Sequence, residues 1–150
     1  MDTLLQRRDG QPGSPDGLPI MAALKTFIVE DSLVIRQSLV ATLEELAPVR
    51  VVGTAQDEWT AVQWLTIPEN VADLVIVDIF LKSGSGLGVL RAAQGLLRQQ
   101  TMIVLSNYAT PDIRLKCQEL GADRVFDKSN DIDALIQFCT QLATGETCDS

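Results

Sequence analysis

The chain has 150 residues, enough for one domain with a hydrophobic core, and 46% of its residues are hydrophobic. Its formal net charge of -8 argues against a nucleic-acid surface, since DNA-binding proteins neutralise phosphates with clustered Lys and Arg. It contains no histidine, which excludes a histidine nucleophile, general base or metal ligand, and no apolar run is long enough to span a bilayer.

Residues 1–23 are rich in Gly, Pro, Asp and Arg, so we expect a disordered arm there. Met21 is a candidate natural start, and the intact mass of the natively expressed protein would test whether residues 1–20 are native. The folded domain is expected over residues 24–143, followed by a frayed tail over residues 144–150. Three cysteines without metal-ligand spacing favour a reduced, cytoplasmic compartment, with Cys117 and Cys139 packed inside helices as small apolar groups.

After the arm, five apolar segments alternate with five segments of helical periodicity. The expected strands are residues 25–29, 50–55, 74–77, 101–106 and 124–126. The expected helices are residues 33–46, 57–67, 88–98, 111–120 and 131–142, the second with Trp59, Val62, Trp64 and Leu65 on or near one face. This alternation predicts an α/β fold of the doubly wound, flavodoxin-like kind: a five-stranded parallel sheet in the order 2-1-3-4-5 with helices on both faces.

The third strand, residues 74–77, carries four aliphatic residues without alternation, which is typical of a strand buried on both faces. It ends at Asp78, which is followed by a loop rich in glycine and serine. An ionised carboxylate at the end of a buried strand is costly unless it reaches the rim of the sheet. Ligands bind at the carboxyl ends of such strands, so Asp78 is a candidate functional residue.

Other strands also end in polar residues. Glu30 and Asp31 follow the first strand, Ser106 ends the fourth, and Lys128 follows the fifth. In a parallel sheet all of them lie along one rim with Asp78. Each alone has a structural interpretation: a helix cap, a turn former, a small strand-end residue or a solvated charge. The same holds for Ser32, which could cap the first helix in place of Asp31.

The cluster as a whole favours one chemistry. Carboxylates about 4 Å apart repel by roughly 4 kcal/mol at an effective dielectric near 20, and a hard divalent cation such as Mg²⁺ relieves that repulsion. Lys128 would supply a fixed positive charge for a phosphoryl oxygen or for Asp78. A metal, a lysine and a hydroxyl around one free carboxylate indicate phosphoryl transfer to that carboxylate, with Asp78 as the nucleophile.

These residues, in this order, resemble the receiver domain of two-component response regulators over residues 24–142, in its stand-alone form without an output domain. The resemblance implies that Asp78 is the phosphoacceptor and that Mg²⁺ is held by Glu30, Asp31, Asp78 and the backbone carbonyl of Phe80. It also implies that Ser106 hydrogen-bonds the phosphoryl group and that Lys128 neutralises it. Gly86 stands where the family has a glycine in the loop after the acceptor.

The resemblance further implies a phosphorelay role. The phosphoryl group would come from a phosphohistidine on a histidine kinase or phosphotransfer protein, and the signal would pass to a downstream protein target. The chain would be a phosphoacceptor module that assists its own phosphorylation and dephosphorylation rather than an enzyme. The last two helices and the fifth strand would form the output face, and any homodimer would use the same face.

The chain departs from the family pattern beside the site. Lys82 and Ser129 stand where the family usually has proline, which alters the acceptor loop and the turn after Lys128. Asn107 replaces the common alanine beside the hydroxyl of Ser106 and could narrow access to the phosphoryl group.

The aromatic switch position is Val125, which has no ring to rotate. Tyr108 or Phe126 could take a related role, and each is equally well explained as a core or rim aromatic.

Three rival functions follow from the same residues. A flavodoxin-like cofactor binder would need a first loop that attracts phosphate, whereas Glu30 and Asp31 repel it. A hydrolase of the aspartyl-phosphate type needs a second acid two residues after the nucleophile, where this chain has Phe80. A degenerate receiver that is never phosphorylated and serves as a protein-interaction scaffold is the remaining alternative.

Overall fold

The protein is described by a computed structural model that covers residues 23–96 and 100–145. The expected arm, residues 1–23, lies outside the described residues apart from Ala23, and so do Cys148 and the last five residues of the expected tail. No helix in the described part of the chain is both long and apolar enough to cross a membrane.

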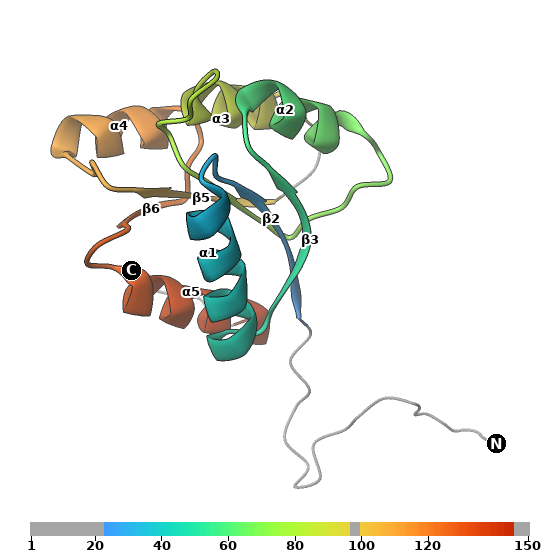
Figure 1. Cartoon of the computed structure of the whole chain (residues 1–150), viewed down its shortest axis with the longest axis vertical. Helices are drawn as coiled ribbons and strands as arrows, with labels where there is room; N and C mark the ends of the chain where they lie inside the picture. The colour runs from blue at the N-terminus through green and yellow to red at the C-terminus, as the bar shows by residue number, and fades with distance from the viewer. Residues whose placement is uncertain (1–22, 97–99, 146–150) are drawn as a thin grey trace, which may run out of the picture.

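Five strands and five helices alternate along the described chain (Figure 1). The strands are β2 (Leu24–Val29), β3 (Val49–Ala55), β4 (Leu74–Val77), β5 (Thr101–Ser106) and β6 (Arg124–Asp127). The helices are α1 (Leu33–Leu46), α2 (Glu58–Thr66), α3 (Gly86–Gln94), α4 (Pro111–Glu119) and α5 (Ile132–Thr144). All strand pairs are parallel and the order is β3-β2-β4-β5-β6, which confirms the predicted order 2-1-3-4-5.

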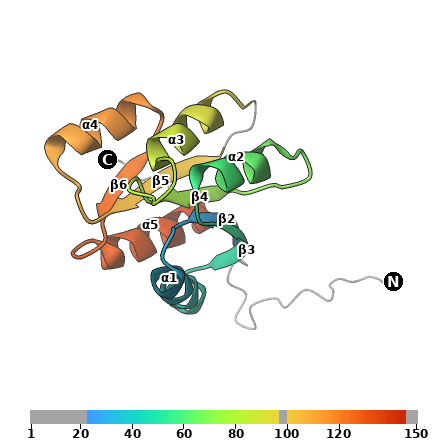
Figure 2. The ribbon, with the colours of Figure 1, turned by 45° about the horizontal axis from the view of Figure 1, so that its top comes forward.

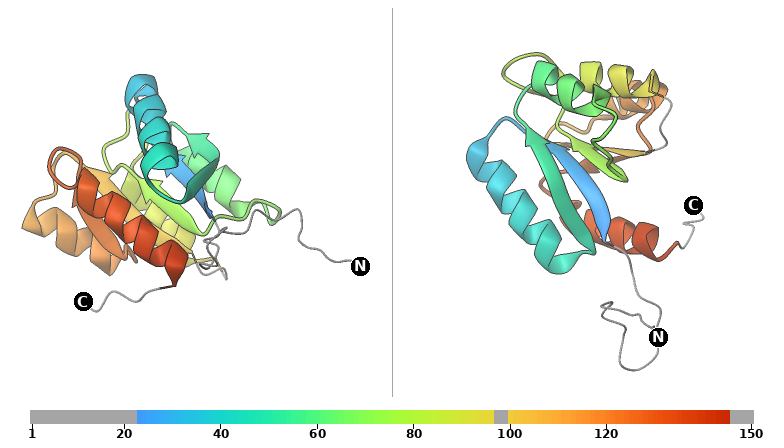
Figure 3. Two further views of the ribbon diagram at one scale, coloured as in Figure 1. Left: turned by 90° about the horizontal axis from the view of Figure 1, so that it is seen from below. Right: turned by 90° about the vertical axis from the view of Figure 1, so that its right-hand side faces the viewer.

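The helices lie in two layers with the sheet between them. Helices α2, α3 and α4 cover one face, and α1 and α5 cover the other (Figures 1 and 2). Seen from below, α1 and α5 both lie in front of the sheet (Figure 3). Each layer has its own buried cluster of apolar residues, and the buried thiols of Cys117 in α4 and Cys139 in α5 belong to one cluster each, as expected.

Strand β4 is the centre of the sheet. All four of its residues are buried, and it pairs with β2 on one side and β5 on the other. The register places Val77 beside Val29 and Val104, so these strands reach the same edge together. The residues that follow β2 and β4 therefore emerge side by side, which is what the predicted site requires.

The boundaries of α3 and α5 differ most from the prediction, and those of the other helices agree with it to within one residue. Helix α3 begins at Gly86, two residues earlier than expected, because the hydroxyl of Ser85 accepts a hydrogen bond from the amide of Leu87 at 3.0 Å and caps the helix. It ends at Gln94, and the last two residues of the predicted helix, 97 and 98, lie outside the described residues. Helix α5 continues to Thr144 and is capped by Gly145, whose positive φ of 78° suits glycine.

The predicted apolar face of α2 is partly wrong. Trp59 is 72% exposed and points to solvent, whereas Leu65 is buried. Trp64 instead stacks on Phe27 of β2, with ring centroids 4.0 Å apart and planes within 6°. Gly53 in β3 makes this possible, because a Cβ at that position would lie 2.7 Å from the indole nitrogen.

Candidate functional site

The backbone at the strand ends fixes the positions of the site residues. The amide of Glu30 donates to the carbonyl of Ala55 at 2.9 Å, and the amide of Asp78 donates to the carbonyl of Val29 at 3.0 Å. These bonds extend the sheet pairing by one residue beyond the strands. The carboxylates of Glu30 and Asp78 therefore extend from the rigid edge of the sheet and not from a loop without hydrogen bonds to it.

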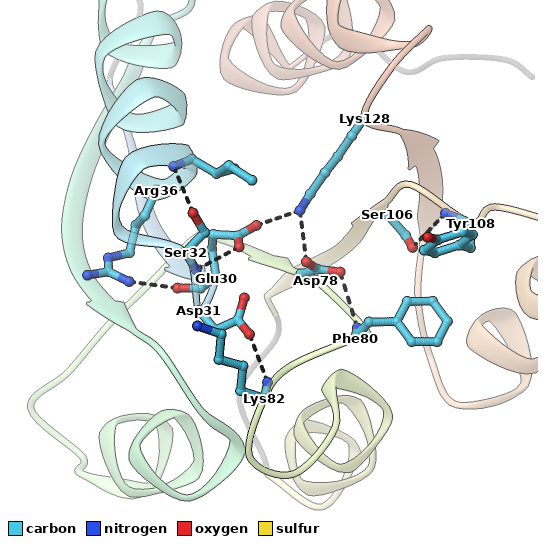
Figure 4. Close-up of polar contacts among 11 residues, drawn as sticks. Glu30, Asp31, Ser32, Arg36, Asp78, Phe80, Lys82, Ser106, Tyr108 and Lys128 are labelled. Atoms are coloured by element: carbon cyan, nitrogen blue, oxygen red, sulfur yellow. Dashed lines mark hydrogen bonds and ion pairs between the residues drawn. The ribbon is translucent and has the colours of Figure 1, made fainter.

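Lys128 joins the two buried acids (Figure 4). Its Nζ donates to Glu30 Oε1 at 2.6 Å and to Asp78 Oδ2 at 2.8 Å. Glu30 is 2% exposed and Asp78 is 8% exposed, so both charges are largely removed from water. The structure thus brings Lys128 together with residues 50 and 98 positions away in the sequence. The predicted pairing of Lys128 with Asp78 is present.

The protonation state of Lys128 follows from the same contacts. Burial by itself would lower the pKa of the Lys128 amine, but its hydrogen bonds to Asp78 and Glu30 and their negative charges outweigh that effect and raise the pKa above 10.5. The amine therefore stays positively charged at physiological pH, as neutralisation of a phosphoryl group would require.

Asp31 completes an acidic cluster. One carboxylate oxygen from each of Glu30, Asp31 and Asp78 lies within 4.8 Å of the others. Asp31 Oδ2 accepts a hydrogen bond from the amide of Lys82 at 2.8 Å, and no described residue donates to its Oδ1. Oxygens on opposite sides of an octahedral Mg²⁺ lie about 4 Å apart, so the donor set and its spacing suit this ion.

Phe80 and Ser32 hold two of these carboxylates in place. The amide of Phe80 donates to Asp78 Oδ1 at 3.2 Å, and the amide of Ser32 donates to Glu30 Oε2 at 3.0 Å. The hydroxyl of Ser32 also caps α1 by accepting from the amide of Ile35 at 3.3 Å. Ser32 is therefore the cap of α1, which leaves Asp31 free to face the site.

Ser106 ends β5 at the same edge and is fully buried, but its hydroxyl is engaged with its own chain. Ser106 Oγ accepts a hydrogen bond from the amide of Tyr108 at 3.1 Å (Figure 4). Its carbonyl accepts from the amide of Lys128 at 3.0 Å, which ties the ends of β5 and β6 together. A hydroxyl that accepts one bond still has a proton to donate, so Ser106 remains a candidate donor to a group on Asp78.

The aromatic residues near the site differ in environment. Val125 and Phe126 are both buried in β6, and the ring of Phe126 packs against Phe138 of α5 with centroids 6.1 Å apart. Tyr108 is 63% exposed, and its ring meets Phe80 edge-on at 5.3 Å. Phe126 is thus a core residue, whereas Tyr108 and Phe80 lie on the rim of a hollow of about 230 Å³ that contains the acidic cluster.

The turn after Lys128 is stabilised by Asp127. Its Oδ1 accepts hydrogen bonds from the amides of Ser129 at 2.7 Å and Asn130 at 3.2 Å. A proline at position 129 would have no amide to donate, so Ser129 allows this carboxylate to shape the turn. The sequence-based prediction did not single out Asp127. It also missed Arg36, whose Nη1 donates to the carbonyl of Glu30 at 2.7 Å.

Comparison with known families agrees with this geometry. The family model described as the response regulator receiver domain matches residues 26–140. The chain belongs to the response regulator receiver domain family. Receiver domains act in two-component phosphorelay signalling, interact with kinases and downstream targets, and generally bind Mg²⁺ at an acidic site. This chain has an acidic cluster of Glu30, Asp31 and Asp78.

One relative of this receiver domain is a longer protein. A protein-glutamate methylesterase/protein-glutamine glutaminase of Azospirillum brasilense is 30% identical over 117 residues, which cover 74% of this chain and 29% of the relative. The chain therefore spans less than a third of that protein's length.

Solved structures share the fold. A LuxR-family two-component response regulator from Aurantimonas sp. superposes with a TM-score of 0.74 at 22% identity, covering 86% of this chain and 91% of that chain. The response regulator domain of Thermotoga maritima CheB gives 0.69 at 18% identity, covering 84% and 99%. The response regulatory domain of mrkE from Klebsiella pneumoniae gives 0.70 at 20% identity, covering 81% and 97%.

Proposed function

We propose that this receiver domain accepts a phosphoryl group on Asp78 from a phosphohistidine of a partner protein and passes the signal on by protein–protein contact. The observation that supports this most strongly is the double contact of Lys128 with Asp78 and Glu30 beside a third carboxylate. A purely structural ion pair needs one acid for one lysine. Three acids around one lysine leave surplus negative charge that a divalent cation can neutralise, and that cation and Lys128 together would attract a negatively charged phosphoryl group.

The proposed reaction is a direct displacement at phosphorus. A carboxylate oxygen of Asp78 attacks the phosphorus, the P–O bond forms, and the P–N bond to the donor imidazole breaks. The electron pair of that bond stays on the imidazole nitrogen, and the product is an acyl phosphate. Lys128 is fixed 2.8 Å from Asp78 Oδ2, so its positive charge is already in place for the phosphoryl oxygens.

Glu30, Asp31, Asp78 and the backbone carbonyl of Phe80 would hold Mg²⁺. When bound, the ion would draw negative charge from the phosphoryl oxygens and relieve repulsion among the carboxylates. The chain's own contribution is orientation: the amide of Phe80 fixes Asp78, and the amide of Lys82 fixes Asp31.

Exposed apolar residues at the start of α1 favour a partner protein that binds there through a helix of its own. Val34 is 75% exposed, and Leu33 and Ile35 beside it are exposed as well. A groove of about 420 Å³ has among its lining residues Val34, Ile35 and Leu39 of α1, Ile132 of α5, and Lys128. A partner helix in this groove would bring a phosphohistidine next to Asp78.

The face formed by α4, β6 and α5 is the proposed output surface, and Arg114 connects its parts. The guanidinium of Arg114 donates to the carbonyl of Ala109 at 3.0 Å and to the carbonyl of Val125 at 2.8 Å. If Ser106 turns its hydroxyl towards a phosphoryl group, the amide of Tyr108 loses its acceptor and this region can rearrange. Phosphorylation should therefore speed hydrogen exchange at the Tyr108 amide, and unchanged exchange would contradict this route.

In this proposal the protein is a phosphoacceptor and not an enzyme with a separate substrate. It would act in the cytoplasm, where kinases have ATP and where Cys117 and Cys139 stay reduced.

The test is labelling by a small phosphodonor with Mg²⁺, followed by the intact mass. The wild-type chain should gain one phosphoryl group, and Asp78→Asn should gain none while keeping its circular dichroism spectrum. Asp133→Asn, at an exposed position of α5, is the matched control and should be labelled like the wild type. Equal labelling of Asp78→Asn would refute the proposal, and an unlabelled wild type would favour the unphosphorylated scaffold.

A further inference from the structure

The loop between Asp78 and α3 is closed on itself. The amide of Gly86 donates to the carbonyl of Ile79 at 2.9 Å, and Phe80 and Ser85 form an antiparallel bridge. Within the loop, Lys82 takes the place of a stiff proline, so the loop must be held by other contacts. Helix α2 supplies contacts to the end of the loop next to α3, at Ser83 and Ser85.

Glu58, the first residue of α2, contacts the loop through its backbone and its side chain. Its amide donates to the carbonyl of Ser83 at 3.3 Å, and its Oε1 accepts from the amide of Ser85 at 2.9 Å. Ser85 is also the residue that caps α3, so the carboxylate of Glu58 lies at the positive end of that helix. Glu58 thus connects α2, the acceptor loop and α3.

Two glycines make room for this side chain. Gly84 has a positive φ of 79°, and a Cβ there would overlap the Cβ of Glu58. A Cβ on Gly88, in the first turn of α3, would overlap the carboxylate of Glu58. Glycine in a helix costs stability relative to alanine, so Gly88 is best explained by the space that Glu58 occupies.

The loop also carries the contact that orients a metal ligand. Lys82 immediately precedes Ser83, and its amide donates to Asp31 Oδ2 at 2.8 Å. Only Ser83 and Gly84 therefore lie between Lys82, whose amide binds Asp31, and Ser85, whose amide binds Glu58. A loop held at Ser83 and Ser85 has little freedom to move Lys82 away from Asp31.

We propose that Glu58 is a positioning residue for Mg²⁺ binding: it holds the acceptor loop so that the amide of Lys82 keeps Asp31 in the ligand orientation. This inference rests on the proposed function, because it assumes that Asp31 binds Mg²⁺. Residues that orient a metal ligand through a hydrogen bond typically change metal affinity about 10- to 100-fold when they are removed. Glu58 acts one step further away, so we expect the lower end of that range.

The experiment measures the Mg²⁺ dissociation constant of the full chain by titration calorimetry, and the hydrogen exchange of the Lys82 amide without metal. Glu58→Ala should weaken Mg²⁺ binding about tenfold and speed exchange at Lys82. Glu58→Gln keeps an oxygen that can accept from Ser85 and should restore most of the affinity. Asp112→Ala, an acidic residue in the first turn of α4, is the matched control and should bind like the wild type.

A double-mutant cycle of Glu58 and Gly88 tests the role of the Glu58 side chain independently, through the glycine that makes room for it. Gly88→Ala should weaken Mg²⁺ binding in the wild-type background because the added methyl group displaces Glu58. In the Glu58→Ala background the same substitution should leave Mg²⁺ binding unchanged and raise the melting temperature.

The outcomes separate the two proposals. A wild-type chain that binds no Mg²⁺ overturns both the proposed metal site and this inference. A wild type that binds Mg²⁺ while Glu58→Ala binds it equally well overturns the inference alone. A loss of melting temperature without any change in Mg²⁺ affinity or in Lys82 exchange would also overturn it, since Glu58 would then only stabilise α2 and α3.

Discussion

Replacing Lys128 with methionine tests the charge balance of the site. Two unit charges about 2.7 Å apart attract by roughly 6 kcal/mol at an effective dielectric of 20, and Lys128 has two such partners. Glu30 and Asp78, within 4.8 Å of each other, would then repel by roughly 3 kcal/mol with no amine between them. Part of the attraction offsets the cost of burial, so removing one partner should cost about 3–5 kcal/mol of unfolding free energy.

Urea unfolding, followed by circular dichroism, measures this cost in the absence of Mg²⁺. Lys116→Met is the matched control, because Lys116 lies exposed on α4 and should lose less than about 0.5 kcal/mol. Adding Asp78→Asn to Lys128→Met removes one of the repelling charges and should recover part of the loss. Equal stability of the Lys128 and Lys116 variants would refute the view that this lysine neutralises two buried acids.

The Lys128→Met variant also tests how the stability contributed by Lys128 depends on pH, and the raised pKa of Lys128 determines the direction of that dependence. Folding raises the pKa of Lys128 above its ordinary value of 10.5. The stability that this group contributes is therefore fully present below about pH 10.5 and is lost as the pH rises through the folded-state pKa. The difference in unfolding free energy between wild type and Lys128→Met should stay constant up to about pH 10 and narrow above it.

Two further predictions concern the metal and the partner. Asp31→Asn should weaken Mg²⁺ binding at least about tenfold in calorimetry without lowering the melting temperature, since it removes a ligand and a repelling charge together. Retention of wild-type affinity would show that Asp31 is not a ligand. Val34→Asp should slow phosphotransfer from a phosphohistidine protein at least about tenfold, because it places a charge in the proposed docking patch, while labelling by a small phosphodonor stays unchanged. Leu115→Asp, on the exposed face of α4, is the control, and equal transfer to both variants would remove α1 from the donor interface.

The fold could be predicted almost completely, because local sequence patterns determine it. The four aliphatic residues of β4 are buried as expected, and parallel connections leave few alternatives for the strand order. The errors lie where packing decides between similar local patterns. Trp59 and Trp64 are both compatible with the apolar face of α2, and only the stacking of Trp64 on Phe27 selects between them.

The proximity of Glu30, Asp78 and Lys128 could be predicted for a similar reason, since the strand ends of a parallel sheet lie along one edge. The contacts made by backbone atoms could not be predicted. Nothing in the sequence indicates that the amide of Lys82 binds Asp31, or that Glu58 reaches the amide of Ser85. These contacts depend on how α2 approaches the loop, which is a property of the assembled fold.

The central claim is that Asp78 carries the phosphoryl group. Borohydride reduces an acyl phosphate to an alcohol, so treatment of the phosphorylated protein should convert the side chain at position 78 to that of homoserine. Peptide mass spectrometry after this treatment should find the modification at Asp78, and only when phosphodonor and Mg²⁺ were both present. Finding it on Asp31 or another carboxylate, or finding none in a protein that had gained a phosphoryl group, would contradict the account.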